Sequence, residues 1–262
     1  IPPEDRRDFF EWTNKMMFNQ DPEMSAGQEE AEAASFKVIE YAMKLMEQHK
    51  THPKKDIIGA LIDGNGKDEG LSDDEFVWFF LMIIAAGNES TRTVTTQGMR
   101  LLMENPDQLQ YLMDNPDKIP GACEEMLRYN TAFTLMRRQC VEDTEVAGHL
   151  IKKGDKVIMH YHTVNHDETI FGEDAMQFDV RRAERMPDLY NQHRAFGIGQ
   201  HFCLGTHLAR LEMRVMFEEI IPRLRNPKLV GEVAYTRSNL VNGIKRMDIT
   251  FDPEVKPSEQ AA

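Results

Sequence analysis

The sequence has few cysteines, no long apolar run and a shortage of positive charge. Its three cysteines, Cys123, Cys140 and Cys203, are too few and too scattered for a disulfide framework, which favours a reducing cytoplasm. The longest apolar run, residues 76–86, is too short to cross a bilayer, so we expect a buried segment and no membrane span in this chain. Asp and Glu outnumber Lys and Arg by 44 to 31, which argues against nucleic acid or an anionic membrane as the main partner.

No repeat of fixed period and no low-complexity block divides the 262 residues. A chain of this length lies near the upper end for one domain, and we expect a single one. The first residue, Ile1, leads straight into helix-like sequence, so we expect an internal start with any targeting signal upstream.

Capping-box spacings predict two helix starts. SAGQ at residues 25–28 precedes apolar residues at helical intervals, and Ser72 with Glu75 opens the apolar run at 76–86. The second helix is predicted to extend to Glu104, because Asn105-Pro106 ends one helix and begins the next.

The pattern changes after Tyr129. Apolar and polar residues alternate over 145–162 around Lys153-Gly154-Asp155, which predicts a hairpin with its turn at that tripeptide. After Gly205 a last long helix carries two apolar stripes, and we expect it to be buried on both faces. The sequence therefore predicts a mainly α fold with a small sheet.

Residues 196–205, FGIGQHFCLG, place Cys203 where a glycine-rich segment meets that last helix. A helix N-terminus stabilises a thiolate, which is the form of cysteine that binds metal. Gly197, Gly199 and Gly205 permit unusual dihedrals and let the backbone approach something flat. The alternatives are a structural cysteine in a turn, a zinc site made by His201, Cys203 and His207, and a nucleophilic cysteine with a histidine base.

The same ten residues resemble the haem-binding loop of the cytochrome P450 family, F-G-x-G-x-[HR]-x-C-x-G, at every fixed position. Cysteine thiolate is the proximal haem ligand in that family, so the resemblance implies that Cys203 binds the iron of haem b (iron protoporphyrin IX). It implies haem contacts for the residues around the cysteine, namely Phe196, Gly197, Gly199, His201 and Gly205. It also implies the helical P450 prism with a small β-rich region, here lacking its N-terminal third.

AAGNESTRT, residues 85–93, puts polar residues directly after the apolar run. Taken alone, Glu89 is either solvated where the helix surfaces or functional. The stretch resembles the P450 oxygen-activation motif, [AG]-G-x-[DE]-T-[ST], with Ala86 and Gly87 beside the haem. Glu89, Ser90 and Thr91 would then relay protons. Ser90 stands where the family usually has threonine. Serine keeps the hydroxyl but lacks the methyl group that restricts the rotamer of threonine.

EEMLRY, residues 124–129, resembles the E-x-x-R segment of the same family. Glu125 and Arg128 lie on one helix face, and FDVRR at 178–182 resembles the stretch that supplies a second arginine, here Arg182. The family uses this triad structurally. The resemblance further implies propionate contacts from Arg137 and His193, although Arg137 is equally consistent with a solvated strand residue.

Together these motifs imply one P450 domain fragment in three parts. Residues 1–129 would form the helical part with the oxygen-activation and E-x-x-R helices. Residues 130–192 would form a small β-containing region. Residues 193–262 would carry the haem–thiolate loop, the long buried helix and the C-terminal strands. We expect such a fragment alone to be unstable or haem-free.

The implied activity is hydroxylation of an unactivated C–H bond of an apolar small molecule. It would use O₂ and reducing equivalents from NAD(P)H, delivered by a ferredoxin and its reductase. The pocket would be lined by Ala85, Phe133, Leu135, Leu240 and Val241. A looser similarity to bacterial P450s acting on sterol side chains or branched alkyl chains suggests a sterol, terpenoid or fatty chain. The alternatives are a P450-fold enzyme that does not activate O₂ (a peroxide-driven hydroxylase or an isomerase) and a non-catalytic haem-binding sensor.

Overall fold

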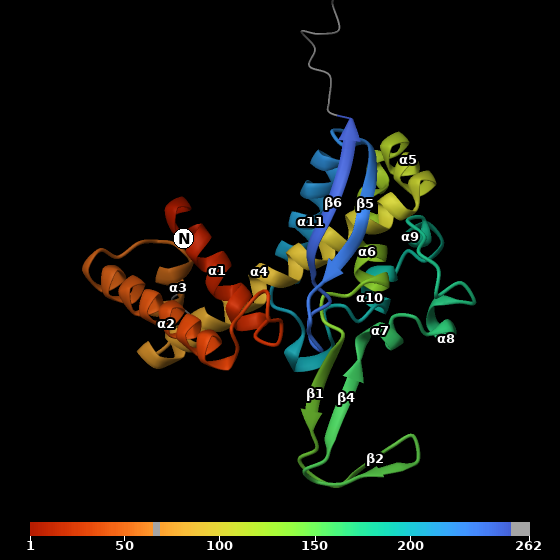
Figure 1. Ribbon diagram of the computed structural model, residues 1–262. Coiled ribbons are helices and arrows are strands. Elements are labelled where there is room, and N and C mark those ends of the chain that lie inside the picture. The colour runs from red at the N-terminus through yellow and green to blue at the C-terminus, as the bar shows by residue number, and fades with distance from the viewer. Residues whose placement is uncertain (65–68, 253–262) are drawn as a thin grey trace, which may run out of the picture. The chain divides into compact units, whose positions relative to one another are not determined.

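Helices dominate the computed structural model, which describes residues 1–64 and 69–252 (Figure 1). The α-helices are α1 (Arg6–Met17), α2 (Gln28–Thr51), α3 (Ile57–Asp63), α4 (Asp73–Glu104), α5 (Pro106–Asp114), α6 (Ile119–Tyr129), α7 (Tyr161–Val164), α8 (Glu168–Phe171), α9 (Arg182–Arg185), α10 (Leu189–Gln192) and α11 (Thr206–Ile220). Short 3-10 helices are η1 (Pro3–Asp5), η2 (Pro116–Lys118) and η3 (Gly199–His201). The strands are β1 (Leu135–Gln139), β2 (Thr144–Val146), β3 (His149–Ile151), β4 (Lys156–His160), β5 (Arg225–Tyr235) and β6 (Ile244–Asp252). The predicted mainly α class with a small sheet content is confirmed.

The chain forms two compact units, Ile1–Glu89 and Ser90–Ala262, and the boundary between them falls inside α4. The last of the three parts expected from the sequence ends in residues 253–262, which lie outside the described residues. Within the described ranges, no helix combines the length and apolar character that a bilayer crossing requires.

The first unit is built on α1, α2, α3 and the N-terminal part of α4 (Figure 1, red to orange). Phe9 of α1 makes edge-on ring contacts with Tyr41 of α2 and Phe80 of α4, with centroid distances of 4.8 and 6.3 Å. Val38 and Phe76 complete the centre of this core. Phe76 and Phe80 of the apolar run at 76–86 are thus core residues, but Trp78 and Met82 are exposed, so the run is buried only in part.

The start of α4 follows from a local signal. The Ser72 amide donates to Glu75 Oε2 at 2.9 Å and the Glu75 amide donates to Ser72 Oγ at 3.4 Å, which is the reciprocal capping box expected from the sequence. The helix ends at Glu104, and Pro106 occupies the first turn of α5. Both predicted ends of α4 are confirmed.

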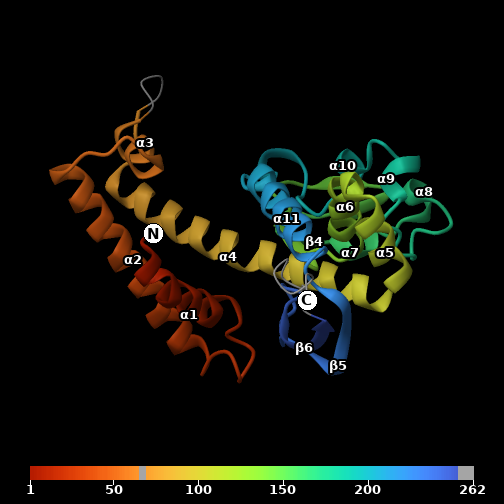
Figure 2. The same cartoon turned by 90° about the horizontal axis from the view of Figure 1, so that it is seen from above.

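The second unit centres on α6 and α11, which pack side by side (Figures 1 and 2). Met126 of α6 and Phe217 of α11 are buried together with residues of α4 and α5. A Cβ on Gly98 would lie 2.6 Å from Met126 Sδ and 2.8 Å from the Phe217 ring. A larger residue at position 98 would therefore force the side chains of Met126 and Phe217 to shift.

The strands form three antiparallel pairs, β1–β4, β2–β3 and β5–β6. The predicted hairpin turn at Lys153-Gly154-Asp155 is wrong, because the β2–β3 turn lies at Ala147 and Gly148, with φ of 50° and 80°. Lys153-Gly154-Asp155 instead connects β3 to β4, and β4 pairs with β1 from Leu135 opposite His160 to Gln139 opposite Lys156.

Helix α11 buries one apolar stripe, not two. Met213 and Phe217 are fully buried in the core, whereas Leu204 is 73% exposed and Leu208 59% exposed. The expectation of burial on both faces is therefore wrong for this structure, since Leu208, Leu211 and Val215 of the second stripe are exposed.

Candidate functional site

Cys203 lies between η3 and α11, in a loop held by its own backbone. The Cys203 amide donates to the Phe196 carbonyl at 3.0 Å, and the Phe202 amide donates to the Gly199 carbonyl at the same distance. The Thr206 amide then donates to the Cys203 carbonyl at 3.4 Å, at the first residue of α11. The sulfur is thus fixed just before a helix N-terminus, and the thiol forms no disulfide.

Two glycines give this loop its path. Gly197 and Gly199 have φ of 76° and 75°, in the left-handed region that favours glycine. Gly205 has φ of −83°, which residues other than glycine also adopt. A Cβ on Gly205 would lie 3.9 Å from Cys203 Sγ, so a side chain at position 205 would be in contact with the sulfur.

This arrangement fits a haem held by one thiolate. The loop presents a single soft donor beside exposed apolar side chains, including Ile198, Phe202 and Leu204. Among the residues that the structure describes, no group of three or more His, Cys, Asp or Glu side chains is placed to hold a metal ion. The zinc alternative built on His201, Cys203 and His207 therefore lacks a converging ligand set.

Three buried charged side chains form a triad on α6 and α9. Arg128 Nε donates to Glu125 Oε2 at 2.7 Å, and Arg182 Nε donates to the same carboxylate at 3.1 and 3.2 Å. All three side chains are at most 1% exposed. The structure brings together the three residues that the sequence assigned to this cluster.

The two arginines also bind main-chain carbonyls of the segment before α9. Arg128 donates to the carbonyls of Asn165 and Ala175 at 2.6 and 2.8 Å, and both arginines donate to that of Gln177. Asn165 Oδ1 in turn accepts the Arg194 amide at 2.6 Å. The triad therefore organises residues 165–177 and, through Asn165, the approach to the cysteine loop.

A second charged cluster joins α6 to both sides of Cys203, and sequence reasoning missed two of its members. Glu124 binds His193 Nε2 at 2.9 Å and Arg210 Nε at 2.7 Å. Burial raises the pKa of Glu124, but its bonds to His193 and Arg210 outweigh burial and leave the pKa below its usual value. The available signal was Glu124, the first glutamate in EEMLRY, to which the E-x-x-R pattern gives no role.

His193 does not fit the propionate contact inferred from the resemblance. Its side chain is buried, Nε2 faces Glu124, and Nδ1 accepts the Ala195 amide at 3.3 Å. With both ring nitrogens engaged by the protein, His193 is a structural residue here. Arg137 is exposed on β1 and His201 is exposed in η3, so both side chains remain accessible to a ligand.

Four residues expected to line a substrate pocket come from two adjacent segments. Phe133 forms an isolated antiparallel bridge with Val241, and the Thr134 amide donates to the Leu240 carbonyl at 2.9 Å. Leu135 follows at the start of β1. The structure thus brings Phe133, Leu135, Leu240 and Val241 together, while Ala85 lies on the α4 portion of the first unit.

The polar stretch of α4 is a continuous helix through Gly87. Ala86 and Gly87 are exposed, whereas Glu89 is 0% exposed, so the solvated alternative for this carboxylate is not what the structure shows. Asn88 Nδ2 donates to Thr13 Oγ1 of α1, and Thr13 Oγ1 donates to the Phe9 carbonyl at 2.8 Å. Ser90 and Thr91 are half-buried on the next turn.

Histidines gather after β4. The rings of His162 and His166 stack with centroids 4.2 Å apart, and His166 Nδ1 donates to the His162 carbonyl at 2.8 Å. The pKa of His166 is lowered to about 4, mainly by burial and also by the nearby charges of His162 and Arg128, while the bond to the His162 carbonyl acts in the opposite direction. We therefore expect His166 to be neutral at pH 7 in the folded protein.

This low pKa predicts a loss of stability in acid. The folded pKa of about 4 lies below the ordinary 6.5, so the unfolded chain binds more protons between these values. The free energy of unfolding should fall as the pH drops from about 6.5 towards 4, and His166→Phe should flatten that fall. Denaturant titrations at several pH values measure this, with exposed His149→Gln as the control. An acid limb identical in wild type and His166→Phe would contradict it.

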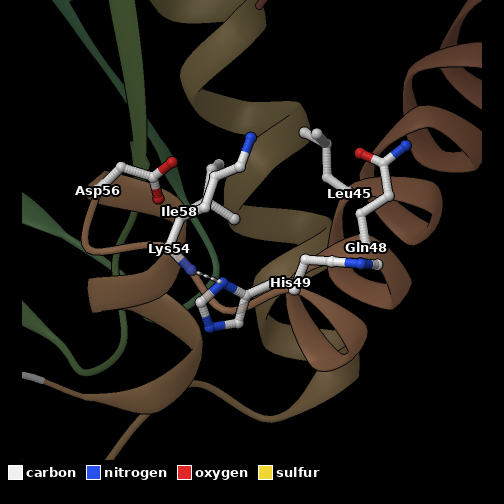
Figure 3. Close-up of a pocket in the computed structure, with 7 residues that line it drawn as sticks. Leu45, Gln48, His49, Lys54, Asp56 and Ile58 are labelled. Atoms are coloured by element: carbon white, nitrogen blue, oxygen red, sulfur yellow. Dashed lines mark hydrogen bonds between the residues drawn. The ribbon is translucent and has the colours of Figure 1, made fainter.

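A pocket of about 370 Å³ lies at the end of α2 and the segment leading into α3 (Figure 3). His49 lines it, with Nε2 on Asp63 at 2.8 Å and Nδ1 accepting the Lys54 amide at 3.4 Å. The other lining residues are Leu45, Gln48, His52, Lys54, Asp56 and Ile58. None was predicted from the sequence to be functional. We place the candidate site at the cysteine loop, where the thiol of Cys203 lies just before the N-terminus of α11.

Comparisons with known proteins agree with this geometry. The cytochrome P450 family model matches residues 8–232. Steroid C26-monooxygenase of Mycolicibacterium smegmatis is 36% identical, over 100% of this chain and 59% of the relative. Linalool 8-monooxygenase of Pseudomonas putida is 32% identical, over 97% of this chain and 61% of the relative. The crystal structure of CYP109E1 from Bacillus megaterium in complex with corticosterone matches with a TM-score of 0.82 and 31% identity, over 95% of this chain and 66% of that one.

The chain spans about three fifths of the length of these two curated relatives. The likeness to a solved structure confirms the fold expected from the sequence.

Proposed function

Because the chain belongs to the cytochrome P450 family, we propose that it forms the haem–thiolate part of a monooxygenase that hydroxylates an unactivated C–H bond of an apolar substrate. The observation that carries the proposal is the placement of Cys203. Its reduced sulfur precedes α11 by three residues, in a loop whose path depends on Gly197 and Gly199.

When bound, haem b would activate O₂, and O₂ would be the source of the oxygen atom that enters the substrate. Cys203 would give the iron its thiolate ligand, stabilised by the N-terminus of α11. His201 and Arg137, both exposed, would donate hydrogen bonds to the propionates. Phe196 and the loop glycines would contact the haem, and contacts from Ala86 and Gly87 of α4 are also part of the proposal.

Glu89, Ser90 and Thr91 would deliver protons. A carboxylate and a hydroxyl on successive positions can pass a proton from one oxygen to the next through water. The complete burial of Glu89 supports this role, because a carboxylate is costly to bury without a function or compensating contacts. The serine hydroxyl at position 90 supplies the alcohol.

The substrate is proposed to be a sterol, terpenoid or alkyl chain. The names of the relatives, a steroid and a linalool monooxygenase, support an apolar compound. The adjacent segments that carry Phe133, Leu135, Leu240 and Val241, together with Ala85, would line its pocket. Electrons from NAD(P)H would arrive through a ferredoxin and its reductase, and we place the enzyme in the cytoplasm.

The test is turnover of the full-length holoenzyme with NADPH, a surrogate ferredoxin and its reductase. A sterol, an acyclic monoterpene alcohol and a methyl-branched fatty acid are supplied with ¹⁸O₂, and products are analysed by mass spectrometry. The proposal predicts one ¹⁸O atom in a hydroxylated product of at least one compound. Product formed only with added hydrogen peroxide would identify a peroxide-driven enzyme. Bound haem with no turnover on any compound would favour a sensor.

A further inference from the structure

Two adjacent glutamates on α6 hold different parts of the molecule. Glu125 binds Arg128 and Arg182, while Glu124 binds His193 and Arg210. Neighbouring residues of a helix point about 100° apart, so the pair faces two directions from one fixed element. The Glu125 cluster is the family triad, and the Glu124 cluster has no role in the mechanism above.

The Glu124 cluster brackets Cys203 along the chain. His193 lies three residues before Phe196, and Arg210 lies on the second turn of α11, seven residues after Cys203. Arg210 makes a fork on Glu124, with Nε to Oε1 at 2.7 Å and Nη2 to Oε2 at 2.9 Å. Its Nη1 donates to Thr206 Oγ1 at 2.8 Å, and its Nη2 also donates to the Tyr190 carbonyl at 3.2 Å. Both arms of the cysteine loop are therefore tied to α6 through one carboxylate.

Arg210 also reaches the loop itself. Its guanidinium carbon lies 4.7 Å from the centre of the Phe196 ring, within range of a cation–π contact. The carbonyl of Phe196 accepts the Cys203 amide at 3.0 Å. A movement of Arg210 would therefore shift Phe196 and, with it, the peptide bonded to the cysteine.

We propose that Arg210 and Glu124, with His193, form a positioning unit that fixes Phe196 and the Cys203 loop and sets the reduction potential of the bound haem. The inference rests on the proposed haem–thiolate function. The guanidinium and the carboxylate form a neutral pair close to the ligand loop, so removal of either partner leaves a charge of known sign. An uncompensated anion opposes the added electron and an uncompensated cation favours it.

The test compares reduction potentials of the full-length holoprotein by spectroelectrochemistry. Arg210→Gln leaves Glu124 uncompensated and should shift the potential to more negative values. Glu124→Gln leaves Arg210 uncompensated and should shift it to more positive values. Arg210→Lys keeps the charge but loses the planar fork and the ring contact. Its potential should stay near wild type while a larger fraction of its carbon monoxide complex loses the thiolate-type Soret band.

Arg214→Gln is the matched control, because Arg214 lies one turn further along α11 and pairs at 3.7 Å with exposed Glu218. Hydrogen exchange of the amides of residues 193–205 gives a readout independent of charge, and it should rise in Arg210→Gln but not in Arg214→Gln. Shifts of the same sign in Arg210→Gln and Glu124→Gln, or potentials and exchange equal to wild type in both, would overturn the inference. Failure of wild type to show a thiolate-type spectrum would instead overturn the proposed function.

Discussion

Glu125→Gln should lower the free energy of unfolding by about 3–5 kcal/mol, which is a large share of the stability of a typical domain. The substitution keeps the shape of the side chain but leaves the two guanidinium groups of Arg128 and Arg182 buried without their anion. It also weakens the bond that Glu125 Oε1 accepts from the Asp179 amide at 3.0 Å. We expect unfolding at a lower urea concentration, measured by urea denaturation followed by circular dichroism.

Glu218→Gln is the control for this prediction. Glu218 pairs with Arg214 on the surface of α11, at 3.7 Å and with both side chains more than two fifths exposed. Surface pairs of this kind contribute a few tenths of a kcal/mol, so the control should be close to wild type. A Glu125→Gln protein as stable as Glu218→Gln would show that the buried triad does not hold the structure.

Glu89→Gln should reduce the rate of product formation by about 10²-fold or more, the range that a positioned general acid contributes. The amide has nearly the same shape as the carboxylic acid, so the buried site at position 89 should tolerate it. Because proton delivery would become rate-limiting, the solvent deuterium isotope effect on turnover should increase. Stopped-flow and steady-state assays of the full-length holoenzyme measure both quantities.

Two companion variants sharpen the prediction at position 89. Ser90→Ala removes the hydroxyl and should divert reducing equivalents to hydrogen peroxide, whereas Ser90→Thr keeps it and restores the residue usual in the family. Coupling of NADPH oxidation to product should therefore fall in Ser90→Ala and persist in Ser90→Thr. A Glu89→Gln enzyme with wild-type rate and isotope effect would remove this carboxylate from the proton path.

Features encoded by residues close in sequence were predictable. The capping box of α4 involves residues three positions apart, and the proline that opens α5 directly follows its stop. Residues 25–28 show the limit of that approach. Helix α2 begins at Gln28 after Gly27, and it is Glu30, not Gln28, that accepts the Ala26 amide, at 2.6 Å. The local spacing was present, but a neighbouring carboxylate had the better geometry.

The hairpin was misplaced because two turns competed. Lys153-Gly154-Asp155 has favourable turn residues, while the observed turn places Ala147 at a positive φ that alanine rarely adopts. Pairing of β4 with β1, across more than ten residues, decided which turn closes the hairpin. Sequence propensity does not contain that pairing.

The candidate site likewise has a part that could be predicted from the sequence and a part that could not. The cysteine loop and the triad follow patterns of fixed spacing, and the structure places those residues as a connected group. The partner of His193 was invisible, because Glu124 lies 69 positions away and the contact exists only after α6 and the loop have packed. The contacts that His193 makes within the protein could therefore not be predicted from the sequence.

The carbon monoxide difference spectrum of the full-length protein tests most directly whether the sulfur of Cys203 is the axial ligand. Wild type and Cys140→Ser should both show the Soret band typical of thiolate ligation, and Cys203→Ser should lose it. Cys140 is the suitable control because it is a reduced cysteine in the same unit, outside the loop. A thiolate-type band that survives in Cys203→Ser, or its absence from haem-loaded wild type, would contradict the account.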